Sequence, residues 1–200
     1  PKYSIWSDAY YLTINPANLF ALERDKILNG DTSASMQSFS IPAIATSGFA
    51  SAQILDIVDD NHPSSGNATL IYLQDDAWSG VSNDHLKLWD VNVDWNKPAN
   101  SQISNPVELS TSPFTSVFDG GSFSNLTQPS GTDIDAAQAI IMNQAQYRKF
   151  STHNSAIFNF VVDAGSAPMS SGIKGDMTLD VTGKIESWTI IADQEGQVQF

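Results

Sequence analysis

The stretch from Asn67 to Trp95 constrains the fold of this chain most, because its side chains alternate with a period of two. Between His85 and Trp95 one face carries Leu86, Leu88, Asp90, Asn92 and Asp94, and the other carries Lys87, Trp89, Val91, Val93 and Trp95. Successive side chains of a strand point to opposite faces, so this pattern predicts a strand. A first strand over Ala68–Leu73 and a tip over Gln74–Asp84 complete an antiparallel hairpin, since Ser79-Gly80 and Ser82-Asn83 supply turn chemistry.

Turn signals divide the rest of the chain into strands whose order repeats three times. The first unit, about 1–47, has strands at Lys2–Trp6, Ala9–Asn15, Asn18–Glu23 and Ser35–Ile41. The second, about 48–112, has Ala52–Val58, Ala68–Leu73, His85–Trp95 and Gln102–Leu109. The third, about 133–200, has Ala137–Arg148, Ser155–Asp163, Gly172–Val181 and Lys184–Asp193. A low-complexity loop over 110–132 separates the second unit from the third.

Units of four antiparallel strands match the blades of a β-propeller in size. The fold prediction is therefore an all-β, propeller-like segment of about three blades, with a two-sheet sandwich as the alternative. Three blades do not close a ring, since propellers have four to eight. We therefore expect further blades from a longer parent chain or from another subunit. The chain opens on Pro1 rather than Met, which fits a processed chain or a piece of a longer one.

Two windows have mixed signals. Glu23–Leu28 predicts one helical turn, which Asn29-Gly30 closes. In Asp135–Arg148 the alanines and glutamines favour helix, but the apolar residues do not form one helical stripe. We interpret that second window as a strand.

Composition excludes several function classes. The net charge is -13, from 22 acidic and 9 basic residues, so the surface repels nucleic-acid phosphates and anionic membranes. The chain has no cysteine, which excludes disulfides, thiol catalysis and thiolate-bound zinc. No apolar run is long enough for a transmembrane helix, and no signal-peptide pattern is present.

Four motifs resemble those of a family of large, secreted, propeller-like bacterial proteins that mostly lack an assigned function. They are Trp6/Asp8/Tyr10/Tyr11, Leu22/Glu23/Arg24, Val93/Asp94/Trp95/Pro98/Ala99/Asn100 and Tyr147/Arg148/Phe150/Thr152/His153. The resemblance extends to about Gly172 and implies a propeller fold and secretion to the cell exterior or surface. The sequence departs from the family in two places: Asn154 stands where the family usually has Glu, and Gly172–Asp176 replaces an aromatic-rich strand.

Asp8, Arg148 and His153 are candidate ligand-binding residues. Arg148 and His153 lie close in sequence, and a cation beside an imidazole can bind a carboxylate or a sugar hydroxyl. They can equally pin a hairpin by binding backbone carbonyls. Asp8 precedes Tyr10-Tyr11, which looks like the first blade of five-bladed glycoside hydrolases. The simpler interpretation of Asp8 is a turn residue that accepts backbone N–H groups.

Trp78, at the polar hairpin tip, is the candidate exposed platform for stacking on a sugar ring, whereas Trp89 and Trp95 are predicted to pack in the core. Calcium is the candidate metal. It prefers oxygen ligands, and Asp59, Asp60, Asp75 and Asp76 are acidic loop positions. The dedicated D-x-[DN]-x-[DN]-G pattern is absent, and a solvated acidic surface explains the same residues.

The sequence therefore favours a secreted or cell-surface bacterial module that binds a carbohydrate or a protein without catalysis. The alternatives are part of a propeller-type glycoside hydrolase and a subunit of an extracellular assembly. Glycoside hydrolysis needs two suitably spaced carboxylates. None of the four glutamates, at positions 23, 108, 186 and 195, lies in a recognisable acid motif.

Overall fold

A computed structural model describes residues 1–47, 52–61, 63, 67–118, 120–122, 124, 128–135, 137–151, 154–163, 173–179 and 185–191, the last two ranges as backbone only. Antiparallel strands dominate this part of the chain. One short α-helix, α1 (Arg24–Leu28), and one 3-10 turn, η1 (Pro98–Asn100), are its helical elements. The prediction of an all-β chain built from antiparallel sheets is therefore confirmed.

The first sheet, which we call sheet A, is a four-stranded meander of adjacent strands. Its strands are β1 (Lys2–Ile5), β2 (Ala9–Ile14), β3 (Asn18–Glu23) and β4 (Met36–Ser40). α1 lies between β3 and β4, at the end of the sheet where β1 turns into β2. All four strands lie within the ranges that the sequence predicts for the first unit, and the predicted helical turn is confirmed.

The second sheet, sheet B, has the predicted hairpin at its centre. Its strands are β5 (Gln53–Ile54), β7 (Ala68–Gln74), β8 (His85–Asn92), β9 (Gln102–Ile103) and β10 (Val107–Ser110). Gln74 pairs with His85 and Ala68 with Val91, so the hairpin closes as the alternation predicts. All seven residues of β7 are buried, which means that other elements cover both faces of this sheet.

The third sheet, sheet C, contains β11 (Gln146–Lys149), β12 (Asn154–Phe158), β13 (Ile173–Leu179) and β14 (Ile185–Ile191) as an antiparallel meander. A fifth strand, β6 (Asp56–Ile57), pairs in parallel with β11. The sequence predicts one strand over Ala52–Val58, but the chain changes partner within it. Leu55 donates its N–H to Thr69 of sheet B, and Asp56 donates to the Ala145 carbonyl beside sheet C.

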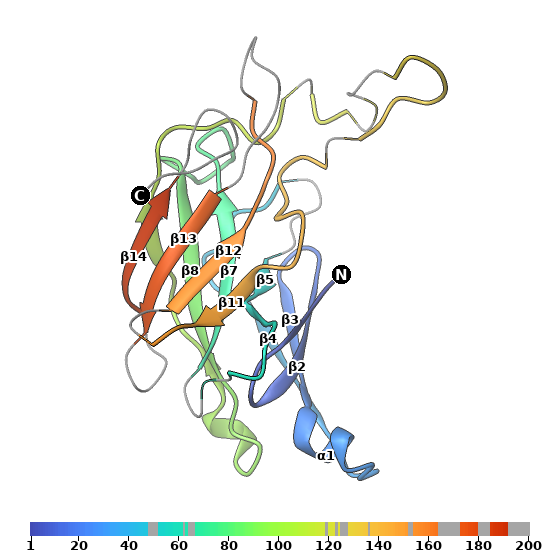
Figure 1. The fold of residues 1–200 in the computed structure, drawn as a ribbon, viewed down its shortest axis with the longest axis vertical. Coiled ribbons are helices and arrows are strands. Elements are labelled where there is room, and N and C mark those ends of the chain that lie inside the picture. Colours follow the sequence, from blue (N-terminus) through green and yellow to red (C-terminus); the bar gives the residue numbers. More distant parts are fainter. Residues whose placement is uncertain are drawn as a thin grey trace.

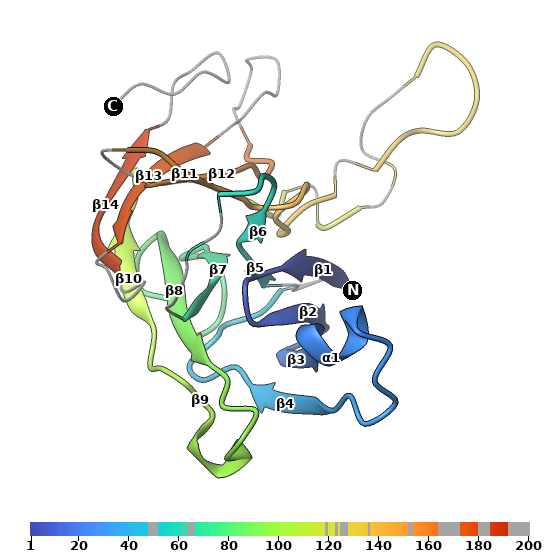
Figure 2. The same cartoon turned by 60° about the horizontal axis from the view of Figure 1, so that its bottom comes forward.

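The three sheets surround one hydrophobic core, and β1 contacts both β5 and β6 where they meet (Figures 1 and 2). Trp6 packs edge-on against Tyr147 with ring centroids 4.9 Å apart, which joins sheet A to sheet C. Two hydrogen bonds tie sheet B to the chain next to the other sheets. The Trp89 indole donates to the carbonyl of Pro42, which follows β4, and the Tyr72 hydroxyl donates to the carbonyl of Ala139, which precedes β11. The described chain forms three sheets and no closed ring of blades.

The predicted strand over Ala137–Arg148 is wrong for most of its length. Ala137 and Ala139 have φ values of 51° and 59°, in the left-handed region that an extended strand excludes. Ile141 and Ala145 are fully buried, although β11 begins only at Gln146. The apolar residues therefore pack inward from an irregular segment, which mimics the composition of a strand.

Two further strands are shorter than predicted. β8 ends at Asn92 rather than Trp95, and the strand predicted to begin at Ser155 becomes β12, which ends at Phe158. In the described chain, no helix has both the length and the apolar character that crossing a membrane requires.

Candidate functional site

Several loops from different sheets meet at one end of the molecule, which we call the α1 end. It contains the β1–β2 turn, α1 and the η1 loop, all of which lie together in Figure 1. On the side of sheet C, the segment after β6 reaches the end of β11, where the Asn61 side chain donates to the Lys149 carbonyl. The opposite end, the tip end, holds the β7–β8 tip, which packs against the chain that follows β10.

Asp8 lies at the α1 end, in the turn between β1 and β2, and its carboxylate is largely buried. The Tyr11 hydroxyl donates to both carboxylate oxygens, at 3.2 and 3.1 Å. Burial raises the pKa of Asp8 to about 6, although the Tyr11 hydrogen bond partly offsets this effect. Burial and the nearby Asp8 charge raise the pKa of Tyr11 well above its usual value, so Tyr11 remains a neutral donor.

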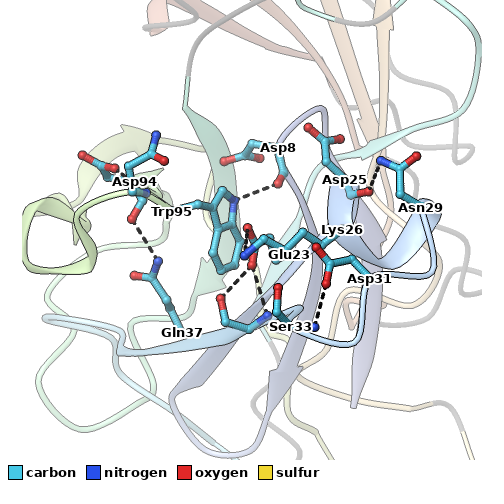
Figure 3. A network of polar contacts seen from close by, with 12 residues as sticks. Asp8, Glu23, Asp25, Lys26, Asn29, Asp31, Ser33, Gln37, Asp94 and Trp95 are labelled. Carbon is cyan, nitrogen blue, oxygen red and sulfur yellow. Dashed lines mark hydrogen bonds and ion pairs between the residues drawn. The ribbon is translucent and has the colours of Figure 1, made fainter.

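Trp95 joins the η1 loop to the Asp8 turn. Its indole N–H donates to the Asp8 carbonyl at 3.1 Å, and the Gln37 amide of β4 donates to the Asp94 carbonyl at 3.1 Å (Figure 3). The Trp95 ring is only partly buried and packs against the edge of the core. The prediction of Trp95 as a core residue is therefore half right, while Trp89 is fully buried as predicted.

The η1 loop is ordered by a carboxylate that accepts several donors. Asp94 accepts the N–H groups of Asn96 and Lys97 and the Asn100 amide. These hydrogen bonds hold the pKa of Asp94 below its usual value, and the one from the Lys97 N–H has the largest effect. The loop that positions Trp95 is thus held by an ionised aspartate.

Glu23 is the second buried acid near Asp8, and the two appear together with Lys26 in Figure 3. Glu23 pairs with Ala9, the residue after Asp8. It accepts the N–H and hydroxyl of Ser35 and lies 3.2 Å from the Lys26 ammonium. Burial opposes ionisation of Glu23, but the Ser35 and Lys26 contacts outweigh it, and the pKa of Glu23 is lowered. The two neighbouring acids therefore have pKa values shifted in opposite directions.

The other predicted residues of the α1 end lie on the side of sheet C. Arg148 is exposed on β11, and Asp59 and Asp60 follow β6, the parallel neighbour of β11. Asp59 accepts the N–H of Asn61, which closes a local turn. His153 lies outside the described residues. Asp59 and Asp60 thus lie on the segment that meets the end of β11, the strand that carries Arg148.

Trp78 is a correction to the sequence prediction. It lies at the tip end and is only 6% exposed, packed against the Tyr72 ring with centroids 5.9 Å apart. Its backbone N–H donates to the Asp75 carbonyl, which turns the chain and folds the indole back over sheet B. Because the ring is buried, the expectation of an exposed stacking platform is wrong.

The four candidate calcium ligands do not form one site. β5 and β7 are antiparallel, so Asp59 and Asp60 lie beyond the start of β7, whereas Asp75 and Asp76 follow its end. Seven strand residues span about 23 Å. Asp75 and Asp76 instead group with Asp84, and the carboxylate oxygens of these three residues lie within 4.8 Å of one another.

The Asp75–Asp76–Asp84 group holds the hairpin tip to the chain after β10. Asp75 accepts the Ala77 N–H on one oxygen, and the N–H and hydroxyl of Ser116 on the other. Asp84 accepts the N–H groups of Asp76 and Phe114, one on each oxygen. All four oxygens of the two buried acids are thus already acceptors, whereas calcium takes six to eight oxygen ligands. The geometry matches a structural clamp.

Sequence reasoning missed Asp84, Ser116 and the role of Tyr11. Asp84 could have been predicted from the sequence, because a hairpin that pairs Gln74 with His85 places Asp75 directly opposite Asp84. Ser116 lies in the predicted low-complexity loop, and its contact with Asp75 spans 41 residues. No local sequence pattern predicts a contact between residues so far apart in the chain.

At the α1 end, an aspartate whose pKa is raised to about 6 thus lies beside a partly exposed indole. Comparisons with protein-family models, with curated proteins and with solved structures found no match to this chain.

Proposed function

We propose that this chain is an extracellular bacterial binding module of the β-propeller type, which holds a carbohydrate at its α1 end without catalysis. In this proposal sheets A, B and C act as blades, and further sheets from a longer chain or another subunit would complete the assembly. Propellers bind ligands through loops at one end of their blades. A cell-surface or secreted location accompanies this proposal, as the resemblance to secreted propeller-like proteins implies.

One observation carries the proposal: the β1–β2 turn of sheet A, which holds Asp8, is joined to the η1 loop of sheet B through the Trp95 indole. A carboxylate accepts sugar hydroxyls strongly, because hydrogen bonds to a charged acceptor are about twice as strong as neutral ones. A partly exposed indole offers an apolar face to a pyranose ring. Both groups therefore supply contacts that a carbohydrate uses.

The net charge of -13 narrows the carbohydrate class. A uronic-acid or sulfated polymer would be repelled by this chain. A neutral oligosaccharide carries hydroxyl donors for Asp8 and meets no such repulsion. We therefore propose neutral hexose oligosaccharides as the ligands.

The test is isothermal titration of the chain with neutral hexose oligosaccharides chosen from a glycan array, and with an oligouronate as a charged comparison. Asp8→Asn should weaken binding about tenfold or more, which corresponds to one charge-assisted hydrogen bond of about 1.5–3 kcal/mol. Arg148→Ala should weaken binding as well. Asp76→Asn, at the tip end, is the matched control and should leave the affinity unchanged.

Absence of retention on an array that covers neutral glycans would overturn the proposal. Equal affinities for the wild type and Asp8→Asn would place the ligand elsewhere and would also count against it. Circular dichroism of each variant separates a loss of binding from a loss of folding.

The raised pKa of Asp8 favours a second candidate, a glycoside hydrolase. A general acid needs a pKa near the working pH, and neighbouring acids with pKa values pushed apart mark acid and base roles. The Ser35 and Lys26 contacts of Glu23 speak against a free partner base. Formation of new reducing ends from a bound oligosaccharide, lost in Asp8→Asn with retained folding, would establish the hydrolase.

A further inference from the structure

One face of sheet A is apolar and open. The strand register places Tyr3, Leu12 and Phe20 in one row and Ile5, Tyr10 and Met36 in the next, all on the same face. Tyr3 is 64% exposed and Met36 is 60% exposed, which is unusual for large apolar side chains in adjoining rows. We call this surface the open face.

The other side of the same sheet is covered. Ser4, Tyr11 and Ala21 form the matching row there and are buried. Ser4 donates its hydroxyl to the Ile54 carbonyl of β5, which ties this side to sheet B. Sheet A thus resembles sheet B in having apolar residues on both sides, but only one side of sheet A is packed.

The open face also differs from the rest of the chain in charge. Its rows contain no carboxylate, although the chain has 22 acidic residues. Arg24 lies at the edge of the face, where its guanidinium is 5.9 Å from the centre of the Tyr10 ring and 3.8 Å from the Asp25 carboxylate. The Arg24 Nε is buried and has no hydrogen-bond acceptor among the described residues. Tyr, Phe, Met and Arg are the residues enriched in protein interfaces, and acids are depleted there.

We propose that the open face binds the open face of a second copy of this chain. An acidic chain can approach another copy closely only where carboxylates are absent, and among the described rows this face meets that condition. The outer side of sheet C is a poorer partner, because Gln146 and Arg148 are exposed on it and would meet apolar side chains. A two-fold pairing of open faces places apolar groups against apolar groups in both copies.

The area is sufficient for a weak dimer. At about 150–250 Å² for a large aromatic side chain, the exposed parts of these rows amount to several hundred Å² per copy. Pairing two faces would then bury on the order of 1,000 Å², about the lower limit for a specific interface. The dimer is therefore expected to be reversible at micromolar concentrations. This inference rests on the strand register and side-chain exposure of sheet A and does not depend on the proposed carbohydrate ligand.

Analytical ultracentrifugation of the 200-residue chain over about 1–200 µM tests the proposal. We expect a monomer–dimer equilibrium that strengthens with added salt, because salt screens the repulsion between two chains of charge -13 and leaves apolar contacts intact. Tyr3→Asp and Met36→Asp should each weaken dimerisation at least tenfold. Ile157→Asp, at an exposed apolar position on sheet C, is the matched control and should dimerise like the wild type.

A spin label locates the interface independently. The chain has no cysteine, so Ser38→Cys introduces a single label in the Tyr3–Leu12–Phe20 row, and Ser110→Cys places a control label on β10. The label at position 38 should lose mobility as the concentration rises, while the label at position 110 should not. A monomer throughout the concentration range, or a dimer that immobilises only the control label, would overturn the proposal.

Discussion

At the scale of single residues, Asp8 is the position where local hydrogen bonds and tertiary burial shift the pKa in opposite directions. As a turn residue it accepts N–H groups, which favours its ionised form, but burial favours the neutral form and is the larger effect. Its pKa of about 6 therefore lies well above that of an aspartate in the unfolded chain. Folding must then work against the charge of Asp8 at neutral pH.

The consequence is a pH-dependent stability with a definite sign. Below pH 4 Asp8 is protonated in both states and carries no penalty. Between about pH 4 and pH 6 the unfolded chain loses this proton first, so the free energy of unfolding falls as pH rises. Asp8→Asn removes the titration and should stabilise the chain by on the order of 2 kcal/mol above pH 6, with little effect below pH 4.

Urea unfolding of the wild type and Asp8→Asn at several pH values between 3.5 and 7.5 measures this difference. Ser110→Ala is the control, because Ser110 is exposed on β10 and carries no titrating group, so its difference from the wild type should be the same at every pH. Parallel pH curves for the wild type and Asp8→Asn would contradict the assigned burial of Asp8.

The sequence locates Asp8 but does not reveal its shifted pKa. The turn and the neighbouring Tyr11 can be read locally, since they are three residues apart. The burial depends on the η1 loop as well, and Trp95 reaches the Asp8 carbonyl from 87 residues away. Contacts of that separation leave no pattern in a single sequence.

At the scale of elements, the β7–β8 hairpin was predictable because its alternation continues along both strands, and packing on both sides of sheet B reinforces it. The segment that ends at Ala145 was not predictable, because its backbone has positive φ values at Ala137 and Ala139. Alanine gives no sequence signal for a positive φ, as glycine or asparagine would. Apolar composition alone then suggested a strand.

The clamp at the tip end leads to a prediction about these elements. Asp75→Ala leaves the buried N–H of Ser116 without an acceptor and should destabilise the chain by about 3 kcal/mol. Ser116→Ala removes one hydroxyl donor and should cost about 1 kcal/mol. Urea unfolding at pH 7 measures both changes.

Asp76→Ala serves as the control for this series, since Asp76 is exposed and its removal should change stability by less than about 0.5 kcal/mol. Calcium provides a second comparison. For a structural clamp, millimolar calcium should leave Tm unchanged. A rise in Tm with calcium that disappears in Asp76→Ala would instead establish an ion site at these three acids.

At the scale of the whole molecule, the three sheets are not equivalent. In sheet B all of β7 is buried, whereas in sheet A no residue of β4 is buried and β4 has one free edge in the described chain. Local opening costs less where few apolar contacts break. Hydrogen exchange should therefore be slowest in β7 and β8 and faster in the edge strands β4 and β10, in which no residue is buried.

Exchange measured by mass spectrometry on dilute protein, where the monomer dominates, tests this order. Amides of 68–74 should exchange at least about a hundredfold more slowly than amides of 36–40, because every residue of β7 is buried, whereas β4 lies at a sheet edge and has no buried residue. Repeating the experiment at high concentration adds a second test, since a copy bound to the open face should slow exchange in β4 and leave β10 unchanged. Equal rates in β4 and β7 would instead mean that the three sheets unfold as a single cooperative unit.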